Sequence, residues 1–445
     1  MPAGQAPCRP LANTIEHIHI SAPRLSGERI RRGPRRGINQ KKLSQIKGVI
    51  TKKFLTSLPA RLLLGIVVGV ILGRLFGEGV MKVVVPIKNI LGQVIMFCVP
   101  LIVIGFIAPS ITTLGENSSR FLGLAVILAY GSSVLAALLS TGAGYILIPH
   151  LSIASDASVR ELPADIFALE IPQIMPVMSA LALSLLLGLA ATWTKSVRMI
   201  ELLKEFQDIV LTIVKKVIIP ILPFYICGTF ICLSYDGTVT KQFPAFIKII
   251  LIVIIGHFLW MAVLYAVAGL YSKKNPKEVF RHYGPAYLTA VGTMSSAATL
   301  SVALECAHKS SVLRKDMVDF GIPLFANIHL CGSVLTEVFF CMAINLMLYG
   351  SLPSVGTMLL FCILLGVFAV GAPGVPGGTV MASLGIVTSV LGFDATGTAL
   401  ILAIFALQDS FGTACNVTGD GALTLILSAY ADKHGIREGS KELQA

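Results

Sequence analysis

The chain has 445 residues, of which 55% are hydrophobic and only 13% are charged. A water-soluble domain of this size does not have such a composition, so the sequence predicts a polytopic membrane protein. Its formal net charge of +12 does not indicate nucleic-acid binding, because the basic residues cluster before and between the apolar segments. The nine Cys residues lie mostly within apolar runs without a CxxC pair, which favours small buried side chains over disulfides or metal ligands.

The first segment, residues 1–54, is polar and basic. It has no short apolar core followed by a small-residue cleavage site, so we expect a disordered cytoplasmic tail rather than a secretory signal. An incorrectly assigned start codon is an alternative origin for the first forty residues. A basic amphipathic stretch, 198–216, is expected to lie at the inner membrane surface. Membrane helices are expected at about 57–77, 83–108, 121–149, 167–194, 216–234 and 244–271.

The pattern changes from residue 284 onward. Residues 284–307 are rich in small and polar side chains, whereas 355–391 is an apolar stretch broken by Gly and Pro. A helix is expected after each, at about 317–349 and 396–430. Non-helical backbone is tolerated at membrane depth only where protein buries it or a wet cavity adjoins it. We therefore predict two re-entrant hairpins, which mark a transporter's binding site when they occur at corresponding positions of two halves. The alternative is that these Gly and Pro residues only kink packed helices.

The charges of the connecting segments predict the orientation. The loops expected inside are rich in Lys and Arg, whereas those expected outside hold mostly Asp and Glu. This asymmetry places both termini in the cytoplasm, which requires an even number of crossings. Eight crossings fit, together with hairpins that enter from opposite sides. The expected organisation is one integral domain over 55–432, followed by a cytoplasmic tail over 433–445.

A polar stripe follows the last apolar run. Asp409, Thr413, Asn416 and Asp420 are spaced by four, three and four residues. This spacing places them on one face of a helix, with the two Asp residues about 16 Å apart along it. An ionisable group at membrane depth is costly and normally faces a cavity or a partner. A stripe that only joins helices is the alternative, but two Asp residues with an Asn favour a binding face.

Three motifs occur in order in the last third of the chain: Ser295-Ser-Ala-Ala-Thr-Leu300, Gly371-Ala-Pro-Gly-Val-Pro-Gly377 and Asn416-Val-Thr-Gly-Asp420. Residues 280–430 thereby resemble the dicarboxylate/amino acid:cation symporters, and Leu407-Gln-Asp-Ser410 is similar to the version in the bacterial sodium/serine-threonine symporters. The resemblance implies an all-α glutamate-transporter fold of eight transmembrane helices plus two re-entrant hairpins, arranged as inverted repeats. It also implies a homotrimer and an elevator motion. The implied scaffold is about 57–108 and 167–234, and the implied transport core is about 121–149 and 244–430.

The resemblance also implies a substrate site. Asp409 would hold the substrate ammonium, while the Asn416 amide and the backbone at the hairpin tips would hold its carboxylate. Glutamate carriers have an Arg at the position of Gly412 or Met294, so a second substrate carboxylate would lack a partner here. We therefore expect a small neutral amino acid, with serine or threonine as the first choice. The expected substrate-binding residues are Asp409, Thr413, Asn416, Ser295, Ser296, Ser333, Gly374 and Val375.

For the coupling ion, the family motif Asn-Met-Asp-Gly-Thr reads His329-Leu-Cys-Gly-Ser333 here. The missing carboxylate and thioether predict fewer coupled cations than in glutamate carriers. Na⁺ is a hard ion that prefers oxygen ligands. The resemblance implies one Na⁺ site formed by Asp420 with carbonyls of Phe325, His329 and Asn416, and a second formed by carbonyls of Asn327, Ala369, Val370 and Ala372.

Several side chains leave open the coupling of a proton or of a further cation. His329 and Glu337 keep proton coupling open, since His titrates near neutral pH, although a hydrogen-bonded core residue is favoured for His329. Ser132 and Ser133 match hydroxyls that lie near a cation in the family, and bonding to their own helix is equally favoured.

The predicted function is therefore secondary active symport in the cell (plasma or inner) membrane, with inward Na⁺ movement driving amino-acid uptake. No resident cofactor, enzymatic activity or nucleic-acid partner is expected. A proton-coupled carrier, or a carrier of dicarboxylates or acidic amino acids, is the alternative. An intramembrane aspartyl protease is disfavoured, because Asp409 and Asp420 lie eleven residues apart on one helix and cannot share a proton. A passive channel fits the paired hairpins less well than alternating access does.

Overall fold

The computed structural model describes residues 58–116, 120–151, 162–163, 166–167, 169–372, 374 and 376–436. The expected N-terminal tail, 1–54, and the chain from residue 437 lie outside this part. Residues 53–445 form one compact unit. All regular elements in the described part are helices, and it contains no strand, which confirms the all-α prediction.

The first half of the described chain forms seven α-helices and two short turns of other helix types. They are α2 (Leu58–Leu75), α3 (Glu78–Glu116), α4 (Arg120–Leu147), the 3₁₀ turn η1 (Ile148–His150), α5 (Val177–Trp193), α6 (Val197–Ile213), the π turn η2 (Val214–Ile218), α7 (Ile219–Tyr235) and α8 (Thr238–Ser272).

The second half is made of shorter helices followed by one long helix. They are α9 (Lys277–Phe280), α10 (Gly284–Thr293), α11 (Ser296–His308), α12 (Lys315–Ile328), α13 (Cys331–Tyr349), α14 (Val355–Gly371), α15 (Gly378–Ser389) and α16 (Ala395–Lys433). Six helical stretches in the described part are long and apolar enough to cross a membrane: Glu78–Thr112, Phe121–His150, Val197–Tyr235, Ala245–Ser272, Lys315–Tyr349 and Ala395–Lys433.

One set of helices packs around α3 and α7. Helix α2 lies along α7, and α3 contacts α5, α6 and α7. Gly65, Gly69 and Gly73 form a small-residue face on α2, where an added Cβ at Gly65 would lie 2.8 Å from the Pro223 carbonyl oxygen of α7. Such close backbone approach is a common way for helices to associate where the hydrophobic effect does not distinguish helix from lipid. These helices are the segments expected to form the scaffold.

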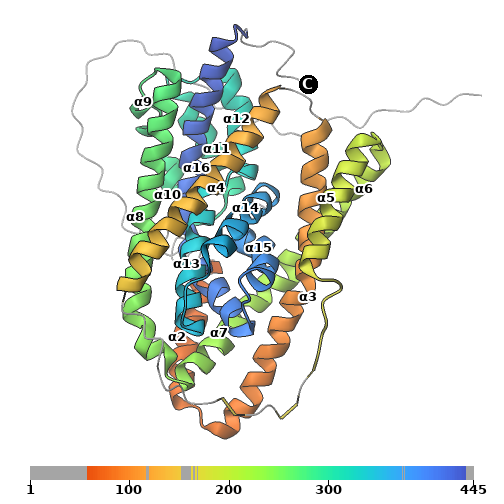
Figure 1. Cartoon of the computed structure of the whole chain (residues 1–445), viewed down its shortest axis with the longest axis vertical. Coiled ribbons are helices and arrows are strands. Elements are labelled where there is room, and N and C mark those ends of the chain that lie inside the picture. Colours follow the sequence, from red (N-terminus) through yellow and green to blue (C-terminus); the bar gives the residue numbers. More distant parts are fainter. Residues whose placement is uncertain are drawn as a thin grey trace, which may run out of the picture. The chain divides into compact units, whose positions relative to one another are not determined.

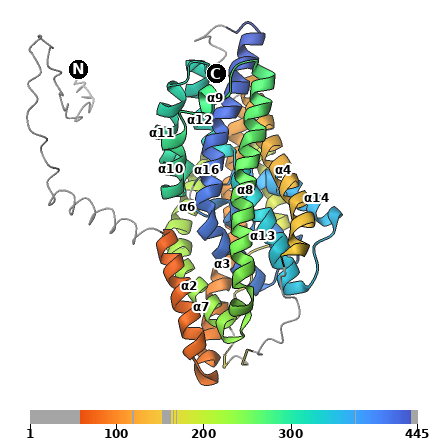
Figure 2. The same cartoon turned by 90° about the vertical axis from the view of Figure 1, so that its left-hand side faces the viewer.

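A second set surrounds α16. Helix α16 contacts α8, α10, α12 and α13, and α13 also packs against α4. Figure 1 and Figure 2 show α16 in dark blue running between α8 and the α10–α12 group. Since α16 is flanked on several sides, most of its residues are buried, including the whole predicted polar stripe. These helices are the segments expected to form the transport core.

The two stretches predicted to be broken are each divided into two short helices. Helices α10 and α11 meet at Met294 (φ 53°), and Ser295 caps α11 by accepting a hydrogen bond from the Ala298 N–H. Helix α14 ends at Gly371 and α15 begins at Gly378. Gly377, just before α15, has a left-handed backbone conformation (φ 71°). The ten residues of α10 rise only about 15 Å, half of a bilayer's hydrocarbon thickness. In Figure 1, α10–α12 lie nearer the end at which α16 finishes than α13–α15 do.

Two predicted boundaries are wrong. The helix expected at 317–349 is interrupted at His329 and Leu330, between α12 and α13. The helix expected at 167–194 begins only at Val177, because the residues that precede Pro172 and Pro176 disfavour helical backbone. The amphipathic stretch 198–216 continues through the π turn into the next helix, and its position at the inner membrane surface stays a prediction.

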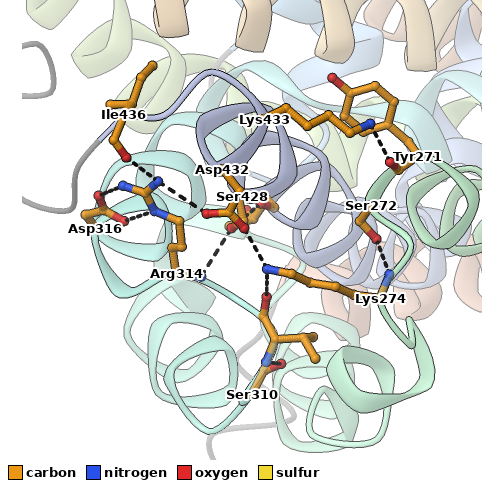
Figure 3. Close-up of polar contacts among 12 residues, drawn as sticks. Tyr271, Ser272, Lys274, Ser310, Arg314, Asp316, Ser428, Asp432, Lys433 and Ile436 are labelled. Atoms are coloured by element: carbon orange, nitrogen blue, oxygen red, sulfur yellow. Dashed lines mark hydrogen bonds and ion pairs between the residues drawn. The ribbon is translucent and has the colours of Figure 1, made fainter.

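A cluster of polar and charged side chains lies where α8 and α16 end and α12 begins (Figure 3). Arg314 binds Asp316 at 2.5 Å, Asp432 at 3.4 Å and the Ile436 carbonyl oxygen at 2.8 Å. Lys274 binds the other oxygen of Asp432 at 2.9 Å. The cluster therefore joins the end of α8, the start of α12 and the end of α16, and it fixes the position of α12 along α16.

Candidate functional site

Asp409 lies on α16 where three interrupted stretches meet. Its side chain is buried, and its Oδ1 accepts a hydrogen bond from the Ser333 hydroxyl at 2.8 Å. Its Oδ2 accepts a hydrogen bond from the Gly377 N–H at 3.3 Å. Ser333 belongs to the first turn of α13, and Gly377 precedes α15. Asp409 therefore holds the second broken stretch against the interrupted helix through neutral donors only.

Asn416 explains why the helix breaks before Cys331. Its Oδ1 accepts hydrogen bonds from the N–H groups of Gly332 at 2.7 Å and Ser333 at 3.3 Å. Its Nδ2 donates to the Ser333 hydroxyl at 3.0 Å. The first N–H groups of a helix have no partner within that helix, and here a side chain from α16 supplies it. The predicted binding residue therefore also has a structural function.

The close approach of α13 to α16 depends on glycine. An added Cβ at Gly332 would lie 2.5 Å from the Gly412 carbonyl oxygen, and one at Gly412 would lie 3.2 Å from the Ser333 backbone. Any side chain at either position would push the two helices apart. The position of Gly412, where glutamate carriers are expected to hold an Arg, is therefore packed directly against backbone.

The tips of the two broken stretches touch each other. The Ser295 hydroxyl donates to the Gly374 carbonyl oxygen at 2.6 Å. Ser296 is the buried first residue of α11, and Thr413 is buried on the Asp409 face of α16. Seven of the eight predicted substrate residues therefore lie in the described part, around the Asp409 junction. The eighth, Val375, lies outside it.

Asp420 has a different partner. Its Oδ1 lies 2.8 Å from His329 Nδ1, and His329 Nε2 lies 2.9 Å from the Ser132 hydroxyl. All three side chains are buried. Both ring nitrogens of His329 thus have partners, as in a hydrogen-bonded core residue. Ser132 bonds across to His329 rather than to its own helix, while the Ser133 hydroxyl has no hydrogen-bond partner among the described residues.

The predicted cation residues are brought together to different degrees. Phe325 is buried, and its carbonyl oxygen accepts the His329 N–H at 2.9 Å, so these two residues and Asp420 are directly linked. Of the second set, Asn327 lies on α12, and Ala369, Val370 and Ala372 lie at the end of α14, which contacts α12. The Asn327 amide donates to the Pro323 carbonyl oxygen at 2.8 Å. No hydrogen bond described in these segments links Asn327 with the other three.

The sequence did not single out two further polar contacts beside the site. His257 Nε2 lies 3.1 Å from the Gly332 carbonyl oxygen and 2.8 Å from the Thr336 hydroxyl. Ser383 donates to Glu337 Oε1, while Glu337 Oε2 has no partner in the part of the chain that is described. The sequence signal that identifies Asp409, an ionisable side chain inside an apolar run, would also have identified His257. Ser383 gives no such signal, because a Ser in an apolar helix is common.

Buried carboxylates and amides at a junction of interrupted helices, in a protein with six membrane-length helices in its described part, define a membrane transport protein. The chain belongs to the sodium:dicarboxylate symporter family, whose family model matches residues 58–430. The predicted resemblance is thereby confirmed.

Relatives with curated functions are transporters, in agreement with the expectation that the chain is not an enzyme. The chain is 28% identical to human excitatory amino acid transporter 2 over 228 residues, which cover 49% of the chain and 39% of the relative. It is 30% identical to neutral amino acid transporter B(0) of Macaca fascicularis over 199 residues, which cover 44% and 36%. Bovine excitatory amino acid transporter 3 is 27% identical over 266 residues, which cover 58% and 49%. Each alignment thus spans less than half of the relative's length.

Proposed function

We propose that the protein is a secondary active symporter that couples inward Na⁺ movement to the uptake of a small neutral amino acid, with serine or threonine as the first choice. The observation that carries this proposal is the buried Asp409 carboxylate, which is held by a hydroxyl and a backbone N–H and by no basic side chain among the described residues. A buried carboxylate with only neutral partners is well suited to an ammonium group. The glycine at position 412 supports a neutral substrate, because no basic side chain stands where glutamate carriers are expected to hold an Arg.

The substrate ammonium would replace one of the two donors on Asp409. If the Gly377 N–H is displaced, the tip of the second broken stretch loses its bond to α16, so binding and gating are linked through one carboxylate. The substrate carboxylate would accept from Asn416 Nδ2 and from backbone N–H groups at the start of α11, where the helix dipole favours an anion. A substrate hydroxyl would bond to Ser333 or Thr413.

Sodium would bind at Asp420 with carbonyl oxygens of Phe325, His329 and Asn416. Because the His329 imidazole already takes Oδ1 of Asp420, the ion would use the other carboxylate oxygen or displace the imidazole. The second ion would use carbonyls of Asn327, Ala369, Val370 and Ala372. Cys331 adds no oxygen ligand, which supports fewer coupled ions than in glutamate carriers.

The proposed mechanism is an elevator. Eight membrane crossings and two re-entrant hairpins, α10–α11 and α14–α15, would form inverted repeats with both termini in the cytoplasm. The helices around α3 and α7 would be the scaffold of a homotrimer in the plasma or inner membrane, and the helices around α16 would move. The division of contacts into two sets supports this proposal, as do hairpin tips that meet at Ser295 and Gly374.

A second candidate is a proton-coupled carrier, or one for acidic amino acids. The buried Glu337, with one oxygen bonded by Ser383 and the other unpartnered among the described residues, favours a proton. Two of the relatives named above are excitatory amino acid transporters, which favours an acidic substrate.

Reconstituted liposomes separate these candidates. Purified protein would be supplied with labelled serine, threonine and aspartate, under an inward sodium gradient or under a pH gradient in sodium-free buffer. We expect sodium-driven uptake of serine or threonine and none of aspartate. Uptake driven by the pH gradient alone, or aspartate uptake, would favour the second candidate.

A further inference from the structure

A cavity with polar and charged lining residues lies apart from the Asp409 junction. It has a volume of about 460 Å³ and is bordered by α3, α7, the end of α15 and the start of α16. It shares no residue with the candidate site and lies near the beginnings of α3 and α16, at the end of the unit expected to face outward. Its polar and charged lining consists of Lys88, Asn89, Gln93, Gln173, Tyr225, Thr388, Asp394 and Thr398.

Lys88 is the side chain that requires an explanation. It is only 6% exposed and lines the cavity, and its aliphatic stem covers Gly228, where an added Cβ would lie 3.1 Å from Lys88 Cβ. No ion pair or hydrogen bond joins Lys88 to another residue of the described chain. Most of the side chain is therefore covered by protein, and the ammonium group borders the cavity without a partner among the described residues. An anionic group of a ligand in the cavity would supply that partner.

A negative charge borders the same cavity. Asp394 caps α16, since its Oδ1 accepts the Gly397 N–H at 2.8 Å and the Tyr349 hydroxyl at 3.0 Å. It forms no ion pair with Lys88, although both line the cavity. Gln93 is oriented by the Ile171 N–H, which donates to its Oε1 at 2.6 Å and leaves its NH₂ group as a donor. A lining that holds one charge of each sign together with amide groups complements a zwitterion better than a simple anion.

We propose that this cavity is a second, weaker binding site for an amino-acid zwitterion, whose carboxylate binds Lys88 while its ammonium faces Asp394. That the amino acid is the transported substrate rests on the proposed function. The cavity is large enough to hold a small amino acid together with water molecules. Substrate would occupy it before reaching Asp409.

Occupancy of the cavity would also affect turnover. Its lining comes from α3 and α7 of one helix set and from α16 of the other, and the Tyr225 hydroxyl of α7 donates to the Ala395 carbonyl oxygen of α16 at 3.3 Å. A ligand that contacts both sets stabilises their present arrangement relative to any other. Excess substrate should therefore slow uptake, and this inhibition should depend on Lys88.

The test measures the binding of labelled serine to purified full-length protein over a wide concentration range. We expect two components in the unmodified protein. Lys88→Met should weaken the low-affinity component at least about tenfold and leave the high-affinity one unchanged, whereas Lys88→Arg should keep both. Asp409→Ala should remove only the high-affinity component. The matched control is Lys82→Met, because Lys82 lies on the same helix but is exposed and pairs with Glu78 at 3.0 Å.

Several outcomes would overturn the inference. They are a single component or none in the unmodified protein, a low-affinity component that survives Lys88→Met, equal effects of Lys88→Met and Lys82→Met, and competition by acetate as strong as that by serine. If Asp409→Ala leaves both components intact, the proposed function fails while the Lys88 result still decides this inference. Gel filtration checks that each variant is folded, and serine inhibition of uptake at high concentration gives an independent measurement.

Discussion

The two buried carboxylates of α16 lie in contrasting surroundings. Asp409 accepts hydrogen bonds from a hydroxyl and a backbone N–H that belong to two other segments, whereas Asp420 bonds to an imidazole that is itself held by Ser132. Neutral donors can be exchanged for a ligand, whereas an imidazole that bonds a carboxylate occupies one of the oxygens that a cation would use. The comparison supports the proposal that Asp409 receives the substrate ammonium and adds that sodium at Asp420 would compete with His329.

The largest effect is expected at Asp409. Asp409→Ala should lower the affinity for the neutral amino acid by about 3–5 kcal/mol, as expected when one partner of a buried charge pair is removed. Equilibrium binding of labelled serine measures this loss. Thr413→Ala, one turn further along α16, serves as the matched control and should lose at most about 1 kcal/mol, the value of a single neutral hydrogen bond. Equal losses in the two variants would end the assignment of the ammonium to Asp409.

A large effect of a different kind is expected at Asn416. Asn416→Ala would leave the N–H groups of Gly332 and Ser333 without their partner at the helix break. Unsatisfied buried donors cost about 1–3 kcal/mol each, so thermal unfolding in detergent should occur at clearly lower temperature. A variant of unchanged stability would show that the break does not depend on this amide.

At Asp420 we expect a smaller change that is confined to the ion. Asp420→Asn should raise the sodium concentration needed for half-maximal uptake by about tenfold, since a charged ligand is replaced by a neutral one. Amino-acid binding at saturating sodium should change little. Sodium titration of uptake measures the shift, and an unaltered sodium response would remove Asp420 from the cation site.

His329→Asn tests the competition between His329 and sodium directly. Removal of the imidazole frees Asp420 Oδ1, so we expect sodium to bind up to about tenfold more tightly, as the loss of one hydrogen bond to a charged group allows. The lost contacts to Asp420 and Ser132 should lower stability at the same time. Weaker sodium binding in this variant would mean that His329 supports the ion rather than competes with it.

The smallest effect is expected far from both carboxylates. Arg314→Met breaks the bonds to Asp316 and Asp432 at the end of the bundle, which should reduce stability by about 1–2 kcal/mol. Substrate and sodium affinities should remain within about twofold, because the bonds that Arg314 makes reach none of the candidate site residues. Thermal unfolding and serine binding together check both statements.

The sequence indicated those features that depend on composition and spacing. The polar stripe of α16 follows from the intervals between Asp409 and Asp420, and the two broken stretches follow from their Gly, Pro and small polar residues. The break at His329 gave no local signal, because its N–H groups are satisfied by Asn416, more than eighty residues away. The pairing of His329 with Asp420 was hidden for the same reason, since only tertiary packing brings α12 against α16.

The bond between the Ser295 hydroxyl and the Gly374 carbonyl oxygen has a wider consequence. It joins two segments that are expected to face opposite compartments, so neither can move away without removing a partner from the other. If the two segments gate opposite compartments as proposed, opening one would weaken the closure of the other. A single hydroxyl would then make the permeability of each face depend on the state of its opposite.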